Sequence, residues 1–252
     1  MRALVTNDDG IDSRGIAELA GVAVRAGLDV LVAAPHTERS GTSASLGAMR
    51  EDGKVLFEES PLEGLDGVRA LAVEATPAFI AWAGVRGAFG FEPDIVLSGI
   101  NKGPNAGRAI LHSGTVGAAF TANAHGLDAL AVSQNAAEPQ HWATAAAMAE
   151  RTLAWLLKSD HEEPTVVNLN VPDVPAEELR GLRAAPLASF GAVQADIAEI
   201  GEGFLTVTYS EVDATREPHT DAGLGSIGWA TVTALQWPCE SRHPSFDDLV
   251  DE

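Results

Sequence analysis

The chain has 252 residues and an apolar content of 46%, which is enough for one large domain with a full-sized hydrophobic core. Its formal net charge is −20, and a field of that sign repels nucleic acid polymers and anionic membranes. No apolar run approaches the roughly 20 residues that span a bilayer, and no signal-peptide region precedes Asp8. We therefore expect a cytoplasmic protein without a membrane or nucleic acid partner.

Strand-like and helix-like segments alternate over the first two thirds of the chain. Residues 3–6 form a short apolar strand, and residues 15–27 follow with apolar side chains at helical spacing and Gly27 as a stop. Further strands are predicted at 29–35, 94–99, 128–133 and 165–171, with short pieces at 54–58 and 68–73. Further helices are predicted from the N-caps Thr76 and Ser113, the latter ending at Gly126, and over 138–158. This alternation predicts an α/β fold with a doubly wound, mainly parallel sheet.

The last third of the chain changes character. Residues 203–210 and 229–236 alternate β-branched and polar residues, which predicts antiparallel hairpins, and the polar stretch between them reads as a loop. We predict a catalytic α/β domain over residues 1–185. Residues 186–252 are predicted to form a C-terminal β extension and tail, whose unpaired strand edges suit it to oligomerisation.

Oxygen-rich residues follow several of the predicted parallel strands. In an open parallel sheet, ligands bind outside the carboxyl ends of the strands, so we expect these residues to share one edge. They are Asp8 and Asp9 after the first strand, Ser40 after the second, Asn101 after the strand at 94–99, and Ser113, Gly114 and Thr115 at a helix start.

Such a set of side chains suits a metal and a phosphate. Two adjacent carboxylates repel each other unless they are hydrated or neutralised, and carboxylate, hydroxyl and amide oxygens suit Mg²⁺ or Mn²⁺. No His or Cys stands beside Asp8 and Asp9, which argues against a zinc site. The helix start at Ser113 offers free backbone N–H groups to a phosphate. A metal beside a phosphate seat indicates phosphoryl chemistry.

Each residue also has an ordinary structural reading. Asp8 and Asp9 could belong to a solvated turn, and Ser113 could simply cap a helix. His36 and His112 flank the proposed site, and for each of them both substrate contact or proton transfer and a role in loop structure stay open.

Three sharper motifs fail. "GLGSIG" (223–228) has the letters of a dinucleotide fingerprint, but it follows a polar loop and leads into a strand, so the strand–turn–helix context is missing. "GINKGPN" (99–105) lacks the Gly-Lys-Ser/Thr of a P-loop. Cys239 is the single cysteine, which excludes an intrachain disulfide and a cysteine metal cluster, and no arginine follows it at the spacing of a cysteine-phosphatase loop.

Six stretches resemble the SurE (survival protein E) family of metal-dependent 5′/3′-nucleotidases. They are "LVTNDDGIDSRGI", "VAAPHTERSGTSAS", "PDIVLSGINKGPNAG", "HSGTVGAA", "VVNLNVP" and "HTDAGLGSIGWATVTAL". The resemblance implies a Rossmann-like domain with a C-terminal extension used in dimer and tetramer contacts. It implies one divalent metal ion per subunit, Mg²⁺ or Mn²⁺, bound by Asp8, Asp9, Ser40 and Asn101. It implies phosphate contacts for Gly41, Ser113, Gly114 and Thr115, and catalytic roles for Asp8, Asp9 and Asn7.

The chain departs from the family pattern near these residues. Phe79 replaces an acid, His112 replaces a tyrosine and Thr121 replaces a glutamate. Our interpretation is a metal-dependent phosphomonoesterase that acts on nucleoside 5′-monophosphates, or on 3′-monophosphates, as a homodimer or homotetramer. Two alternatives stay open: a phosphatase of other small phosphate esters or short polyphosphate, and a nucleotide-binding or assembly protein that has lost catalysis.

Overall fold

The structure is a computed structural model that describes residues 1–48, 52–159, 162–190, 193–201, 203–211 and 214–236. Cys239 and the rest of the predicted C-terminal tail lie outside the described residues. Within the described ranges, no helix is both long enough and apolar enough to cross a membrane.

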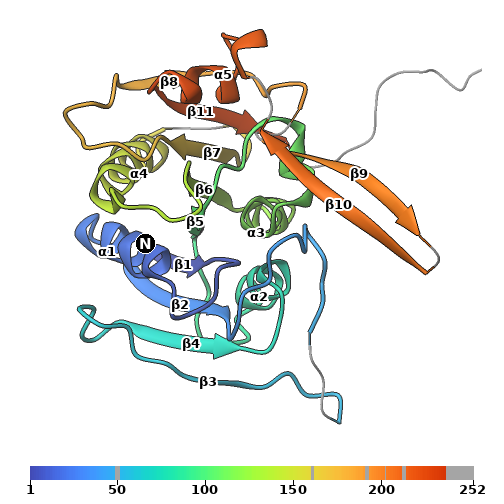
Figure 1. Ribbon diagram of the computed structural model, residues 1–252. Helices are drawn as coiled ribbons and strands as arrows, with labels where there is room; N and C mark the ends of the chain where they lie inside the picture. The colour runs from blue at the N-terminus through green and yellow to red at the C-terminus, as the bar shows by residue number, and fades with distance from the viewer. Residues whose placement is uncertain (49–51, 160–161, 191–192, 202, 212–213, 237–252) are drawn as a thin grey trace, which may run out of the picture.

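Strands and helices alternate as the sequence predicts (Figure 1). The strands are β1 (Arg2–Thr6), β2 (Asp29–Pro35), β3 (Phe57–Glu59), β4 (Arg69–Val73), β5 (Ile95–Lys102), β6 (Asp128–Gln134), β7 (Val166–Val171), β8 (Leu182–Ala184), β9 (Val193–Gly201), β10 (Phe204–Glu211) and β11 (Ala230–Leu235). The helices are α1 (Arg14–Arg25), α2 (Pro77–Gly84), α3 (Gly114–Asn123), α4 (Trp142–Leu156) and α5 (Asp221–Ser226), with short 3₁₀ helices η1 (Gly107–His112) and η2 (Ala214–Arg216).

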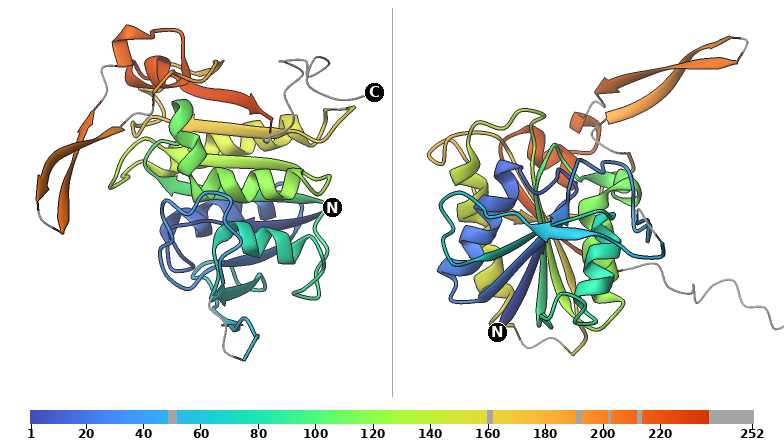
Figure 2. Two further views of the ribbon diagram at one scale, coloured as in Figure 1. Left: turned by 90° about the vertical axis from the view of Figure 1, so that its right-hand side faces the viewer. Right: turned by 90° about the horizontal axis from the view of Figure 1, so that it is seen from below.

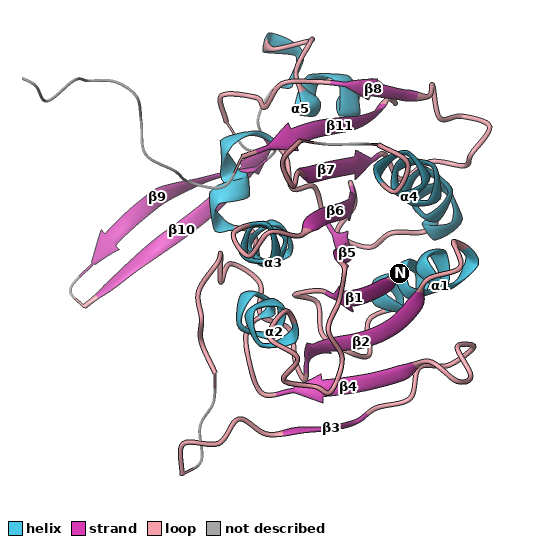
Figure 3. Cartoon of the chain, turned by 180° about the vertical axis from the view of Figure 1, so that it is seen from behind, coloured by secondary structure: helices cyan, strands magenta, loops and turns pink. Residues whose placement is uncertain are grey.

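The body of the molecule is a nine-stranded sheet in the order β3-β4-β2-β1-β5-β6-β7-β11-β8 (Figure 3). The six strands from β4 to β7 are parallel to one another. Their order is that of a doubly wound Rossmann-like sheet, in which the direction of winding reverses beside the first strand. The predicted fold class is therefore confirmed.

Helices cover both faces of the sheet (Figure 2). One layer holds α1 and α4, and the other holds α2 and α3. The helical spacing read from the sequence is the reason, because Ile16 and Leu19 of α1 and Leu153 of α4 are fully buried against the sheet. Local signals also set helix starts: Thr76 accepts a hydrogen bond from the Phe79 amide at 3.4 Å at the start of α2.

Three elements differ from the sequence expectation. β11 pairs antiparallel with β7 and so belongs to the main sheet, although it falls in the segment assigned to the C-terminal extension. The stretch 211–228, expected to be loop, contains the short helix α5. β5 runs on to Lys102, past a register shift between Ser98 and Asn101 in its pairing with β6.

A separate two-stranded sheet projects from the body. β9 and β10 pair antiparallel with each other, and the views from two sides show this hairpin standing clear of the nine-stranded sheet (Figures 1 and 2). The prediction of an antiparallel hairpin that includes residues 203–210 is confirmed.

Candidate active site

The two acidic residues lie at the switch point of the sheet. β1 lies between β2 and β5, with Thr6 of β1 in register with Ser98 of β5. The turn after β1 carries Asp8 and Asp9, and the end of β5 carries Asn101. This is the position in the sheet at which doubly wound proteins bind their ligands.

Asn7 shapes the turn that presents the acids. It is fully buried, its Nδ2 donates to the Gly10 carbonyl at 2.9 Å and to Ser13 Oγ at 2.6 Å, and its Oδ1 accepts from the Gly10 amide at 3.2 Å. Both ends of its amide are thus occupied inside the turn. Through these bonds Asn7 holds the turn that carries Asp8 and Asp9.

Asp8 is a buried carboxylate that faces the start of α3. Only 4% of the residue is exposed, and its Oδ1 accepts a hydrogen bond from Thr115 Oγ1 at 2.5 Å. A methyl group added at Gly114 would lie 2.7 Å from Asp8 Oδ2, so the first turn of α3 lies directly against this side chain. Burial raises the pKa of Asp8, and the bond from Thr115 opposes that rise.

Asp9 is half-buried beside the end of β5. Its Oδ2 accepts a hydrogen bond from the Lys102 amide at 3.1 Å. Burial raises the pKa of Asp9 to about 6, with the Asp8 and Glu38 charges adding to the rise and Lys102 opposing it. Such a carboxylate pair favours cation binding. A positive charge between Asp8 and Asp9 would offset the repulsion between the two carboxylates and the free-energy cost of burying their charges.

The loop after β2 is tied to the same turn. The Arg39 amide donates to the Asp8 carbonyl at 2.7 Å, which brings the neighbouring Ser40 to the site. The Ser40 hydroxyl itself donates to Glu38 Oε1 at 2.7 Å. Gly41 follows in a left-handed conformation, with φ of 74°, on an exposed part of the loop.

The side-chain amide of Asn101 is bonded to the backbone through its nitrogen atom, Nδ2. Its Nδ2 donates to the carbonyls of Lys102 and Gly103, at 3.0 and 2.9 Å. Since both N–H bonds are directed at the backbone, Oδ1 is the atom with which Asn101 could bind a cation.

The start of α3 lies against the Asp8 side chain. Ser113 Oγ accepts from the Val116 amide at 3.1 Å, which confirms the predicted N-cap. Thr115 is fully buried and its hydroxyl is used on Asp8, a contact that no spacing in the sequence indicates. The backbone at Ser113 and Gly114 is the part of this stretch suited to a phosphate.

The residues present fit a divalent cation. A buried carboxylate, a second carboxylate with a raised pKa and the Asn101 amide oxygen come together at one edge, and the Ser40 loop is tied to them. In the described part of the chain, no group of three or more His, Cys, Asp or Glu residues is placed to hold a metal. A site here would therefore depend on the neutral oxygens of Ser40 and Asn101.

The two histidines and two of the residues that depart from the family pattern contact residues outside the acidic turn. His36 Nδ1 lies 2.9 Å from Glu74 Oε1, a hydrogen bond that raises the pKa of His36. His112 accepts a bond from the Ser43 amide through its backbone carbonyl, at 3.3 Å. The Phe79 ring packs 5.3 Å from that of Trp82, and the Thr121 hydroxyl donates to the Gly117 carbonyl within α3.

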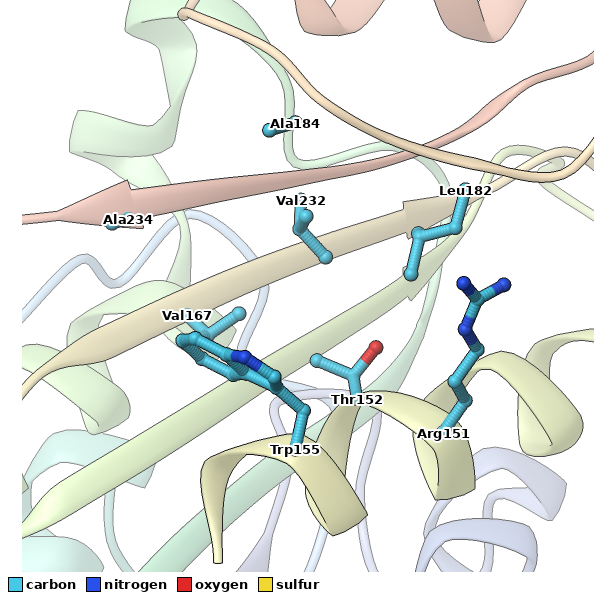
Figure 4. A pocket seen from close by; sticks show the side chains of 8 residues that line it. All are labelled: Arg151, Thr152, Trp155, Val167, Leu182, Ala184, Val232 and Ala234. Carbon is cyan, nitrogen blue, oxygen red and sulfur yellow. The ribbon is translucent and has the colours of Figure 1, made fainter. Parts of the chain in front are cut away.

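An apolar pocket of about 350 Å³ lies elsewhere, between α4 and strands β7, β11 and β8 (Figure 4). Trp155 and Arg151 reach over it from α4, and Val167, near the start of β7, forms part of its floor. The start of β7 is at the opposite edge of the parallel strands from Asp8. This pocket lacks carboxylates, so it does not fit a metal and a phosphate.

The fold and the acids at its switch point define a doubly wound α/β protein with two acidic residues at the carboxyl edge of its parallel strands. The family model described as "Survival protein SurE" matches residues 3–192. The 5′-nucleotidase SurE of Stenotrophomonas maltophilia (strain R551-3) is 38% identical over 241 residues, 94% of this chain and 90% of that protein. The 5′/3′-nucleotidase SurE of Serratia proteamaculans (strain 568) is 41% identical over 191 residues, 75% of this chain and 70% of that one.

A solved structure agrees with these sequence matches. The crystal structure of the SurE protein from Aquifex aeolicus superposes with a TM-score of 0.77 at 27% sequence identity, and 95% of each chain is covered. The chain belongs to the SurE family.

Proposed function

We propose that the protein is a divalent-metal-dependent 5′-nucleotidase, which hydrolyses nucleoside 5′-monophosphates to nucleoside and phosphate, with 3′-monophosphates as further substrates. The observation that carries the proposal is the buried Asp8 carboxylate facing the start of α3. A helix start attracts a phosphate, whereas a carboxylate repels it. The two can serve one site when a cation lies between them, and relatives named as nucleotidases share the family.

Asp8, Asp9, Ser40 and Asn101 would hold the cation, as Mg²⁺ or Mn²⁺, one per subunit. When bound, such an ion stabilises charge on the phosphoryl group and makes a water molecule more acidic. The Thr115 hydroxyl holds Asp8 in one orientation, and the Lys102 amide does the same for Asp9. The protein's part in binding the ion is thus fixed before the substrate arrives.

The chain's own groups also bind and orient the phosphate. The backbone N–H groups at the start of α3, which follows the N-cap Ser113, lie against Asp8, where they would stabilise negative charge that builds on phosphate oxygens. Gly114 keeps the start of α3 close to Asp8, because a larger residue would collide with the carboxylate. Gly41 is proposed to contact phosphate from the loop after β2.

The proposal is tested by phosphate release from a panel of esters with chelator, with Mg²⁺ and with Mn²⁺. The panel holds nucleoside 5′-monophosphates, 3′-monophosphates, glycerol phosphate and tripolyphosphate. We expect metal-dependent cleavage of the nucleoside monophosphates. Cleavage of tripolyphosphate or glycerol phosphate alone would indicate a different phosphatase, and nucleotide binding without release under any condition would indicate a binding protein.

A further inference from the structure

Two sequence stretches have no part in the proposed chemistry so far. They are "NLNV" (168–171) at the end of β7 and the Thr220–Asp221 pair at the start of α5. Their side chains converge on one segment, residues 103–107. That segment connects Asn101, a proposed metal ligand, to η1 and so to Ser113 and Gly114 at the start of α3. We call these two residues the phosphate seat, because their backbone is proposed to bind phosphate.

Asn105 is fixed by side chains from the neighbouring strands. Its amide donates to Asn170 Oδ1 at 2.9 Å, and its carbonyl accepts from Asn168 Nδ2 at 2.8 Å and from Asn170 Nδ2 at 2.9 Å. Its own Nδ2 donates to Ser133 Oγ at 2.8 Å. Both backbone groups of a connecting residue are thus bonded to side chains of β7, much as a strand would bond them.

Asp221 fixes the start of η1. It is 1% exposed, and its carboxylate accepts three backbone N–H bonds, each of 2.8 Å: from Gly107 to Oδ2, and from Ala188 and Ala222 to Oδ1. Three such donors offset the cost of burying a carboxylate. At Gly107, where φ is +60°, a side chain would also meet the Phe190 carbonyl at 1.7 Å. Asp221 and Phe190, from the C-terminal part of the chain, therefore pack directly against the first residue of η1.

The 3₁₀ helix passes this constraint on to the phosphate seat. η1 spans Gly107 to His112 without interruption, and the Ser113 amide donates to the Ile110 carbonyl at 3.1 Å at its end. Ser113 then caps α3 beside Asp8. If Gly107 moves, we therefore expect Ser113 to move with it. Asn101 should stay in place, because its side chain has its own bonds to the Lys102 and Gly103 carbonyls.

We propose that Asp221 and Asn105 are positioning residues of the phosphate seat, which hold segment 103–113 in the place that phosphate binding requires. This inference rests on the proposed function. It assigns the C-terminal part of the chain a role in substrate binding, through a buried carboxylate that accepts backbone N–H groups of Gly107, Ala188 and Ala222.

The test compares Asp221→Asn with Asp128→Asn in the full-length protein. The Asp128 carboxylate also accepts a backbone N–H, from Thr165 at 2.7 Å, but at the opposite edge of the sheet. The neutral amide at 221 turns an N–H group toward at least one backbone N–H, so that bond is lost. We expect the inhibition constant for inorganic phosphate to rise about 10-fold in Asp221→Asn, as for supporting residues of other sites. The Mg²⁺ concentration for half-maximal activity should stay near that of the wild type, and Asp128→Asn should change neither quantity.

A second variant guards against a folding failure at the buried Asp221. Asn105 is half-buried, and Asn105→Ala removes only the bond to Ser133. It should raise the phosphate inhibition constant in the same direction by less, and amide exchange over residues 103–113 should become faster. The inference would be overturned if both folded variants had the same phosphate inhibition constant and the same amide exchange rates over residues 103–113 as Asp128→Asn. If Asp221→Asn does not fold, the same result for Asn105→Ala alone would overturn it. A wild-type protein that neither releases nor binds phosphate would instead refute the proposed function, and the inference with it.

Discussion

The Thr115 hydroxyl donates to Oδ1 of Asp8 at 2.5 Å, although 107 positions separate the two residues in the chain. Both residues are buried, so the bond is shielded from competing water. It joins the turn after β1 to the first turn of α3. The proposed metal ligands and the proposed phosphate seat are thereby parts of one hydrogen-bonded unit.

Thr115→Val should weaken metal binding. Valine keeps the shape of the side chain but leaves Asp8 buried with one partner fewer, which costs about 1–3 kcal/mol. The pKa of Asp8 should rise further, because the Thr115 bond opposes the effect of burial. We expect the metal concentration for half-maximal phosphate release to increase about 10–100-fold. Thr115→Ser keeps the hydroxyl, and an equal metal requirement in the two variants would contradict the prediction.

Gly114→Ala should abolish activity without unfolding the protein. The new methyl group would lie 2.7 Å from Asp8 Oδ2 and 2.8 Å from Asp8 Cβ, so the carboxylate must move. Gly21→Ala in α1 is the matched control, since its methyl group meets the flexible end of the Arg25 side chain at 3.2 Å and Leu65 Cδ2 at an ordinary contact distance of 4.0 Å. A helical Gly→Ala change gains about 1 kcal/mol of helix propensity. Phosphate release by Gly114→Ala at the rate of Gly21→Ala would show that this close approach has no role.

The metal-free protein should become more stable, relative to an Asp9→Asn variant, as the pH falls. Burial is the main cause that raises the pKa of Asp9 to about 6 from an ordinary 3.8, so between these values the folded state holds a proton that the unfolded state releases. The destabilisation is therefore fully present above pH about 6 and is relieved toward 3.8. Thermal unfolding of both proteins in chelator, from about pH 7 to about pH 5, measures the difference. A difference that does not change with pH would count against a strained carboxylate pair.

The β9–β10 hairpin should hold copies of the chain together. Its two strands pair only with each other among the described residues, and exposed strand edges favour pairing with another chain. Light scattering should give at least a dimer. A chain in which a short Gly-Ser turn replaces residues 193–211 should give a smaller particle, while β11 stays intact in the main sheet. Monomeric wild-type protein, or a particle size unaffected by the replacement, would rule this role out.

Local patterns were enough to predict the sheet and the edge that carries the acids. The apolar strand before Asp8, the Ser113 cap and the helical stripe that contains Leu153 are set by residues a few positions apart. The rule that places ligands at the carboxyl ends of parallel strands then brings Asp8 and Asn101 to one side.

The remaining features depend on contacts between distant residues. β11 alternates like a hairpin strand, and only its pairing with β7 places it in the main sheet. The bond from Thr115 to Asp8 and the bond from Gly107 to Asp221 join residues that are 107 and 114 positions apart in the chain. Spacing does not predict such contacts, because each residue also has an ordinary role as a cap or turn former.

Calorimetric titration of Mn²⁺ into the wild-type protein and into Asp8→Asn, each freed of metal beforehand, tests the central claim most directly. Phosphate release from a nucleoside 5′-monophosphate is followed on the same samples. The account predicts one ion per subunit in the wild type, with activity that disappears in chelator and returns with the metal. It predicts that Asp8→Asn, which keeps the shape of the side chain, loses both. Full activity of the wild type in excess chelator, or unchanged Mn²⁺ binding by Asp8→Asn, would contradict it.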